Sequence, residues 1–218
     1  MRTLISALAL TAAIGLAAPA SAHEAGDWLF RVGASAVDPK SDNGTLDLTA
    51  AGLGPQKIEV DDNTSVTFNV TYMYSKNVGV EILAALPFEH DIYVETLGLV
   101  GTVEHLPPTV SLQYHFMPDS VFQPYAGLGL NYTAMLTSKE RGALQDPLGG
   151  SLDVDDSFGL AAQLGFDYRI TDQWFLNFDL RYIDIDVDTI VSVPGVGTLK
   201  TEVNIDPVVY GIHLGYRF

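Results

Sequence analysis

The sequence contains no cysteine, so disulfide bonds and thiolate metal sites are excluded and the fold must depend on backbone pairing and packing. Basic residues are also scarce. There are 11 Lys and Arg against 27 Asp and Glu, and the formal net charge is −16. A chain this acidic repels phosphate groups, which argues against a nucleic-acid partner.

Long apolar runs are absent beyond the first residues. An uncharged stretch from Leu4 to Ala18 follows Arg2 and precedes the small residues Ala20-Ser21-Ala22. It is too short to span a bilayer comfortably, so a transmembrane helix is the weaker interpretation. The arrangement is typical of an export signal. We predict a cleaved signal peptide over 1–22 and a mature domain over 23–218, whose charge without Arg2 is −17 (10 basic minus 27 acidic residues).

The chain nevertheless has a positive mean hydropathy of +0.18. An alternation of period two, the β-strand pattern, accounts for this combination. In the middle of each segment one parity carries no charged residue: 28–36, 66–74, 78–86, 108–116, 126–134, 158–168, 174–182 and 208–218. The other parity carries polar residues among Gly, Ala, Ser and Thr, without Lys. Eight segments show the pattern: 27–38, 63–75, 77–88, 105–116, 122–136, 156–170, 173–188 and 202–218.

Two barrels fit one apolar face per strand. A soluble lipocalin-like barrel turns that face inward, whereas a membrane barrel turns it towards lipid. The small residues of the polar face, the aromatic residues at both ends of the apolar face and the alternation of short with long connections favour the membrane barrel. The long connections, predicted to be external loops, are 39–62, 89–104, 137–155 and 189–201. We therefore predict an all-β protein, an eight-stranded antiparallel up-and-down transmembrane β-barrel in the outer membrane of a Gram-negative bacterium.

The interior of such a barrel has room only for side chains or one small ligand. An open water pore is therefore not expected. The charged residues of inward parity should instead form a paired polar core that blocks the lumen: Arg31, Glu81, Asp167, Asp179, Arg181 and Arg217.

The positions of apolar and polar residues are exchanged at the ends of the seventh and eighth segments that we expect to lie on the extracellular side. Beyond Tyr182, acidic residues take the outward positions, and apolar residues take the inward ones: Ile183, Ile185, Val187, Val203 and Ile205. If these strands continue above the bilayer, their interior forms an apolar extracellular vestibule. A small hydrophobic plug under the loops fits the parity equally well. The sixth segment departs from the pattern, because Val154 keeps the outward parity.

Prolines interrupt the outer rim between two neighbouring strands. Pro87 ends the third segment, and Pro107 and Pro108 begin the fourth. Because proline donates no ladder hydrogen bond, pairing there should be weak, and a lateral gap could open towards lipid. Simple termination of strands at a long loop is the commoner reason for prolines at such positions.

Several short motifs are similar to those of the OmpW family: HEAG at 23–26, GVE at 79–81, PF at 87–88, HLPPT at 105–109, PYAG at 124–127, NYT at 131–133, DSFG at 156–159, YIDID at 182–186 and GYRF at 215–218. The resemblance spans nearly the whole mature chain, and LPPT is its most specific part. That family is eight-stranded, resides in the outer membrane and includes the alkane-uptake protein AlkL. The resemblance implies passive uptake of small hydrophobic molecules through an apolar extracellular funnel, with lateral release into the membrane past a polar block.

Catalytic and metal sites are weakly indicated. Ser111 and His115 share a strand face but lie too far apart for a nucleophile and its base, so we do not expect an enzyme. His90 and His105 flank one long loop without a convincing third ligand, so we expect no metal. Gly127-Leu128-Gly129 lacks the following helix of a phosphate loop, and we expect no cofactor.

Two functions are consistent with these features. We expect a channel for small hydrophobic solutes, surrounded by outer-membrane lipid and lipopolysaccharide. The alternative is a structural or surface-interaction barrel with a filled lumen, whose acidic loops bind divalent cations that bridge lipopolysaccharide. The sequence favours neither a monomer nor an oligomer.

Overall fold

The computed structural model describes residues 23–40 and 42–218. The predicted signal peptide over 1–22 lies outside these residues. The described chain consists mainly of β-strands, as its period-two alternation predicts. Within this part of the chain, no helix is long and apolar enough to cross a membrane.

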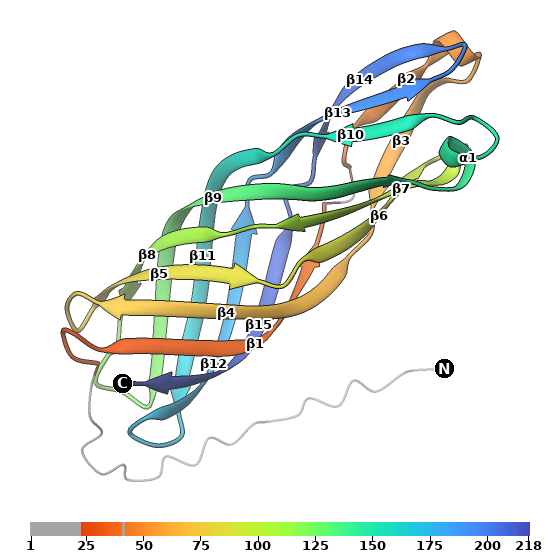
Figure 1. Cartoon of the computed structure of the whole chain (residues 1–218). Coiled ribbons are helices and arrows are strands. Elements are labelled where there is room, and N and C mark those ends of the chain that lie inside the picture. The colour runs from red at the N-terminus through yellow and green to blue at the C-terminus, as the bar shows by residue number, and fades with distance from the viewer. Residues whose placement is uncertain (1–22, 41) are drawn as a thin grey trace, which may run out of the picture.

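Eight strands close into an antiparallel barrel (Figure 1). Each strand pairs with its neighbour, and the last strand, β15, pairs with β1, so that pairing is continuous around the barrel. The prediction of eight antiparallel strands is confirmed. Their bounds are β1 (Trp28–Asp38), β4 (Asn63–Met73), β5 (Val78–Ala85), β8 (Thr109–His115), β9 (Phe122–Glu140), β11 (Ser157–Arg169), β12 (Trp174–Ile183) and β15 (Val208–Arg217).

Four predicted segments are longer than the barrel strands they contain. The segments at 77–88, 105–116, 173–188 and 202–218 each cross a point at which the chain leaves the barrel. Pro87 and Pro107 lie at two of these breaks, and Asp206, which has a φ of 37°, precedes Pro207 at another. Apolar and polar residues alternate on both sides of each break, so the period-two pattern alone does not show where one strand ends and the next begins.

The connections predicted to be long loops are largely built of strands, which extend the barrel at one end. The prediction of loops over 39–62, 89–104, 137–155 and 189–201 is therefore wrong in secondary structure. Alternations such as Leu46 and Leu48 are too short to indicate a strand alone, and pairing within the extension stabilises them. The strands are β2 (Thr45–Leu48), β3 (Gly54–Val60), β6 (Phe88–Val94), β7 (Gly98–Leu106), β10 (Ser151–Val154), β13 (Asp186–Val193) and β14 (Gly197–Asn204), with the short helices η1 (Thr49–Ala51) and α1 (Gly142–Gln145).

Strand β9 belongs to both parts of the molecule. Its first half pairs with β8 and β11 in the barrel, and its second half pairs with β7. From β7 the sheet continues through β6 and β3 to β2, whereas β10, β13 and β14 form a separate sheet. The two sheets meet where Asn43 and Asn204 share hydrogen bonds of 3.2 and 2.9 Å. The extension is therefore tied to the barrel and is held together by its own contacts.

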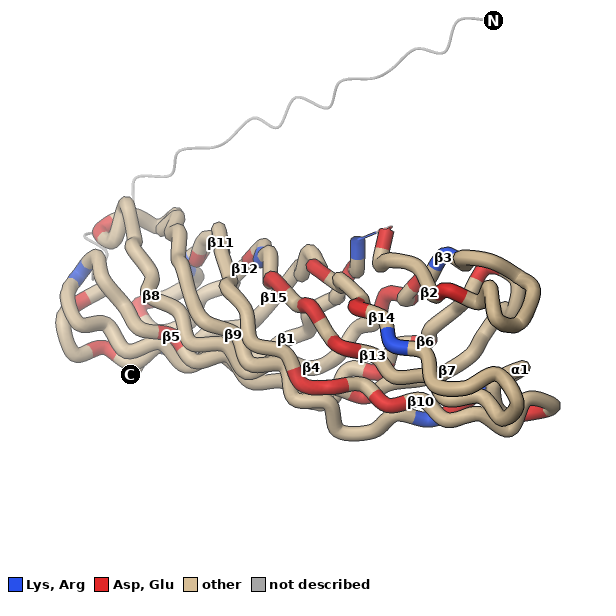
Figure 2. Tube along the Cα trace, turned by 90° about the horizontal axis from the view of Figure 1, so that it is seen from above, with Lys and Arg blue, Asp and Glu red and all other residues tan. Residues whose placement is uncertain are grey.

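The outer face of the barrel is apolar. Its large exposed side chains include Ile82, Leu112, Leu128, Leu164, Leu180 and Ile212. Aromatic rings lie together at the end of the barrel formed by the turns 74–77, 116–121 and 170–173, here called the short-turn end: Trp174 lies 4.8 Å from Tyr216, and Trp28 lies 5.0 Å from Tyr72. Acidic residues gather instead along the extension and its junction with the barrel (Figure 2). An apolar band with an aromatic rim is expected of a barrel in a membrane.

Replacing Leu180 with Arg should lower the free energy of unfolding by about 2–4 kcal/mol, because it places a guanidinium group in the apolar band. Urea titration of the barrel in lipid vesicles measures this change. Leu53→Arg is the matched control, since Leu53 is 43% exposed and Leu180 42%, but Leu53 lies in the extension. Its effect should stay within about 0.5 kcal/mol. Equal urea resistance of the two variants would contradict the lipid-facing position of Leu180.

Candidate functional site

An apolar chamber lies inside the extension, with a volume of 270 Å³. All five residues predicted to line a vestibule are buried in this region: Ile183, Ile185, Val187, Val203 and Ile205. The last three line the chamber itself. The first two line a second, much smaller cavity of 20 Å³, which also touches Arg181 in the barrel. The predicted set therefore divides between the chamber and the cavity at its base.

The sequence analysis missed most of the chamber wall. Strands β2, β3, β7 and β10 contribute buried residues that the predicted loops concealed: Leu46, Leu48, Ile58, Val103, Leu152 and Val154. Counting back from the sixth segment gives Val154 an outward parity, but β10 is a separate strand from β11 and the alternation restarts between them. Val154 is therefore buried. The alternations TLDL at 45–48 and SLDV at 151–154 are the signals that could have identified these residues.

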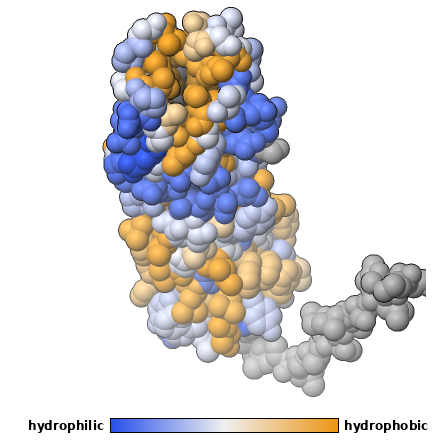
Figure 3. Space-filling model, turned by 90° about the vertical axis from the view of Figure 1, so that its right-hand side faces the viewer, coloured by the Kyte–Doolittle hydropathy of each residue, from blue (hydrophilic) through white to orange (hydrophobic). Residues whose placement is uncertain are grey.

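The surface of the extension is hydrophilic where its interior is apolar. Asp186 and Asp188 are exposed on β13, whereas Val187 between them is buried. Figure 3 shows hydrophobic atoms around a hollow at the top of the extension, a hydrophilic belt below it, and the apolar surface of the barrel beneath the belt. The outward face of the chain therefore changes from apolar on the barrel to polar on the extension.

Buried charged side chains fill the barrel below the chamber. Arg31 of β1 donates hydrogen bonds to both carboxylate oxygens of Asp167 on β11, at 3.2 and 2.8 Å. Its Nη1 also lies 3.3 Å from Oε2 of Glu81 on β5. The guanidinium carbon faces the rings of Tyr125 and Phe175, 5.6 and 5.4 Å from their centroids. Arg31 thus connects three strands across the lumen.

Arg181 of β12 continues this network towards the chamber. Its Nη2 lies 2.9 Å from Oε1 of Glu81 and 2.9 Å from Oδ2 of Asp179. Because Glu81 contacts both arginines, a continuous ion-paired network, here called the polar block, crosses the lumen. It consists of Arg31, Glu81, Asp167, Asp179 and Arg181, all of which are buried. Arg181 also lines the 20 Å³ cavity, so the polar block forms its floor.

Arg217 does not join the polar block as the sequence analysis expected. It is the last residue of β15, at the short-turn end, where its Nη1 lies 3.7 Å from Oδ2 of Asp27. Inward parity predicts the direction of a side chain but not its height along the barrel axis. At the end of a strand, as for Arg217, an inward side chain points into the mouth of the barrel. Conversely, the sequence analysis did not single out Tyr125, which is buried and whose hydroxyl accepts a hydrogen bond from Asn177 at 3.0 Å.

Strand pairing is interrupted beside the small cavity. Strands β5 and β8 pair as far as Leu83 with Thr109, and β6 and β7 pair from Phe88 with His105 onwards. Between these points, no ladder pair in the described chain joins 84–87 to 106–108. Pro87 and Pro108 are exposed there, and Pro107 lines the small cavity. The three prolines thus surround a break in the wall, here called the lateral break.

Two histidines considered as metal ligands lie next to this break. The rings of His90 and His105 stack 5.1 Å apart, and Phe88 stacks on His105 at 5.7 Å. Among the described residues, no third histidine or carboxylate lies close enough to form a metal-binding group with them. They are packed as part of the wall between the extension and the barrel.

Arg31→Met should lower the free energy of unfolding by about 3–5 kcal/mol, because it leaves the buried carboxyl group of Asp167 without its cation and leaves Glu81 with Arg181 alone. Arg217→Met is the matched control. The ion pair of Arg217 lies at the mouth of the barrel, so its loss should cost about 1 kcal/mol or less. Both values come from urea titration in lipid vesicles. A loss of similar size in the two variants would contradict the structural role of the polar block.

Comparison with known proteins agrees with this architecture. A sequence model of the OmpW family matches residues 24–218. Outer membrane protein W of Vibrio cholerae is 38% identical over 224 residues, with 100% of each chain covered. The crystal structure of OprG from Pseudomonas aeruginosa has a TM-score of 0.83 and 38% identity, covering 90% of this chain and 98% of that one. The solid-state NMR structure of AlkL in lipid bilayers has a TM-score of 0.68 and 26% identity, covering 95% and 97%. The chain therefore belongs to the OmpW family and is an outer-membrane β-barrel.

Proposed function

We propose that the chain is a passive channel for small hydrophobic molecules, which enter the chamber from outside the cell and leave sideways into the membrane. In this proposal the extension faces the extracellular side and the short-turn end faces the periplasm, as the long and short connections favour. The observation that carries the proposal is the position of the apolar chamber, above a blocked lumen and next to the lateral break.

The lining of the chamber indicates the class of solute. Apart from the hydroxyls of Thr189 and Thr201, every side chain that lines it is apolar. Its 270 Å³ lies near the lower end of the range of small-molecule pockets, about 300–1,000 Å³. A cavity with so few polar groups selects by size and apolarity. The proposed solutes are therefore small hydrocarbons and similar molecules.

The polar block argues against passage along the barrel axis. A hydrophobic solute moving downward from the small cavity would have to displace Arg181 from Glu81 and Asp179. It would leave buried charges without partners, and separating such pairs costs several kcal/mol. A solute that contributes no hydrogen bonds cannot offset that cost, so the axial path is closed to it.

The lateral break supplies the alternative exit. The small cavity is lined by Phe88, Pro107 and Ile185, and Phe88 and Ile185 belong to the same buried apolar cluster as the chamber lining, so apolar side chains fill the space between the chamber and the break. Beyond the break lies the apolar outer face of the barrel, where an apolar solute is as well accommodated as in the chamber. Such movement down a concentration gradient needs no catalytic residue. It also fits the uptake role that the resemblance to the family implies.

Ile185→Asp should reduce uptake about tenfold or more, because an unpaired carboxylate in the small cavity raises the barrier to an apolar solute by more than 1.4 kcal/mol. Growth on a sparingly soluble alkane and uptake of the labelled alkane measure the effect. Asp188→Asn, a change on the exposed face of the same strand region, should leave uptake unchanged. Equal uptake by cells with and without the protein would refute the channel and favour a structural barrel.

A disulfide across the lateral break should reduce uptake reversibly. Continuing the register beyond Leu83 and Thr109 places Ala84 opposite Pro108. Since the chain has no cysteine, the double variant Ala84→Cys, Pro108→Cys forms one defined bond, which a shift in gel mobility verifies. The control is Val78→Cys with Tyr114→Cys, a facing pair of the same two strands near the short-turn end. Uptake that is restored by reductant in the first variant and unaffected in the second supports lateral release, and unchanged uptake in the oxidised first variant contradicts it.

A further inference from the structure

Three buried side chains of metal-ligand type meet where the polar block, through Asp167, faces the short-turn end. His23 precedes β1, His115 ends β8 and Asp167 lies in β11, and all three are buried. One ligand atom from each lies within 4.8 Å of the others. The two imidazole rings are 5.3 Å apart in an edge-to-face arrangement, and Nε2 of His23 lies 4.0 Å from Oδ2 of Asp167.

The imidazole nitrogens of this group carry unused lone pairs. Nε2 of His115 lies 3.2 Å from Oε1 of Gln113, and with the Gln113 amide in this orientation Nε2 donates the hydrogen bond and Nδ1 keeps a lone pair. Nδ1 of His115 and both ring nitrogens of His23 have no hydrogen-bond partner in the structure. Buried nitrogens without partners are uncommon in native proteins and call for an explanation. A metal-binding histidine usually has a hydrogen-bond acceptor at its other ring nitrogen, and Oε1 of Gln113 is in that position at Nε2 of His115.

The charges around the group also favour a cation. The polar block contains two guanidinium groups, from Arg31 and Arg181, and three carboxyl groups. One carboxyl group therefore has no cation of its own. Asp167, the member of the block closest to the histidines, can accept hydrogen bonds from Arg31 and still offer a lone pair of Oδ2 to a metal ion.

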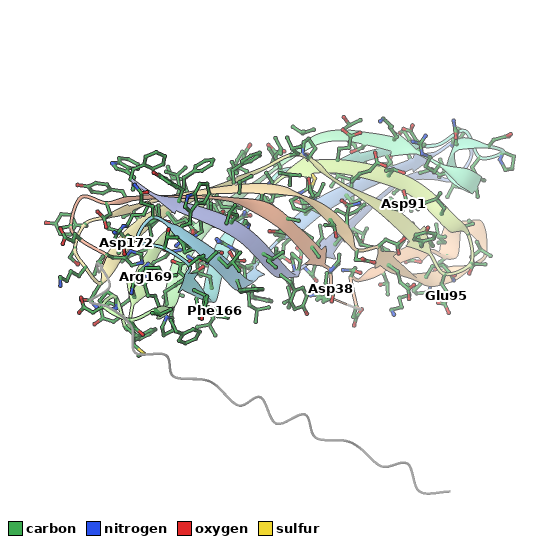
Figure 4. All side chains as sticks on the ribbon, turned by 90° about the horizontal axis from the view of Figure 1, so that it is seen from below. Asp38, Asp91, Glu95, Phe166, Arg169 and Asp172 are labelled. Carbon is green, nitrogen blue, oxygen red and sulfur yellow. The ribbon has the colours of Figure 1, made fainter. Side chains whose placement is uncertain are left out.

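The group is also close to the mouth of the barrel. A small cavity at the short-turn end reaches His23 and is bordered by Arg169, Asp172, Gln173 and Arg217. Figure 4 shows Arg169 and Asp172 at this end of the molecule, far from Asp91 and Glu95 on the extension. An ion would therefore enter from the end opposite to the chamber.

We propose that His23, His115 and Asp167 bind a divalent transition-metal ion, Cu²⁺ in preference to Zn²⁺, at the short-turn end of the barrel. Imidazole ligands suit both ions, and Cu²⁺ binds such sites more tightly. Cu²⁺ favours a tetragonal arrangement, in which neighbouring ligand atoms about 2.0 Å from the ion lie about 2.8 Å apart, so side-chain rotations must draw the three groups, now within 4.8 Å of one another, together around the ion. Only His90 and His105 were considered as metal ligands from the sequence, and no metal was expected because they lacked a third ligand; the group at His23 was missed, because the pattern of the strands does not predict where the residues ahead of β1 lie.

The test uses the mature chain folded in detergent micelles, stripped with a chelator and titrated with CuCl₂ and ZnCl₂ against a competing chelator. We expect one equivalent of Cu²⁺ per chain, bound more tightly than Zn²⁺, with nitrogen couplings in its electron paramagnetic resonance spectrum. His23→Gln and His115→Gln should each weaken Cu²⁺ binding at least tenfold. His105→Gln, a buried histidine near the opposite end, should not weaken it. Heat-modified gel mobility verifies that each variant is folded, and His23→Gln changes no strand.

Two results would overturn the proposal. The first is Cu²⁺ binding by the unchanged chain that is no tighter than binding by the double variant His23→Gln, His115→Gln. The second concerns the free amine that a chain beginning at His23 carries, since that amine and its own imidazole can chelate copper without the barrel. Chains with and without one extra residue ahead of His23 separate the two sources. Binding that needs the free amine and is insensitive to His115→Gln assigns the copper to the terminus alone.

Discussion

The contacts of Glu81 with Arg31 and Arg181 determine what the rest of this structure can do. Eight strands enclose a lumen that side chains can fill, and here the filling is a network of ion pairs in which each buried guanidinium group meets at least one carboxylate. Burying these charges carries a large desolvation cost, which the mutual contacts offset only while the network is complete. The network also blocks the barrel axis, because separating any of its ion pairs would leave a buried charge without its partner. The polar block therefore closes the lumen below the small cavity.

The change of surroundings at the top of the barrel explains why the chamber is apolar. Along β12 the outward side chains are apolar, as with Leu180, and along β13 they are acidic, as with Asp186 and Asp188. If, as proposed, the extension stands in water above a barrel that faces lipid, the apolar parity must move from the outside to the inside. The breaks at Pro107 and Pro207 lie at this level. The lateral break thus lies at the level where the outer face changes from apolar to acidic, and this position is why the proposed function places the exit there.

The barrel could be predicted from the sequence because its strands are long enough for alternation to be unambiguous, and because no charge falls on the outward parity except at the end of β1, where Asp38 is exposed. The extension could not, since strands as short as β2 and β10 show two alternations at most, and their pairing partners are remote in the sequence. Parity also fails at two kinds of position. It predicted the inward direction of Arg217 but not its place at the mouth, and it says nothing of His23, which precedes the first strand. A break between two strands, such as the one between β10 and β11, restarts the alternation of inward and outward side chains. Counting across this break assigned Val154 to the wrong face.

The two ends of the molecule share one set of contacts even though their chemistry differs. Asp167 lies 4.0 Å from His23 at the short-turn end and binds Arg31, which contacts Glu81, which in turn contacts Arg181 at the base of the chamber. An ion held by His23, His115 and Asp167 would compete with Arg31 for the same carboxylate. Arg31 would then depend more on Glu81, which must also serve Arg181. A contiguous chain of contacts does not by itself amount to coupling, because coupling needs an element with two arrangements. Glu81 is the residue that could supply them, since its two oxygens serve one arginine from each side of the polar block.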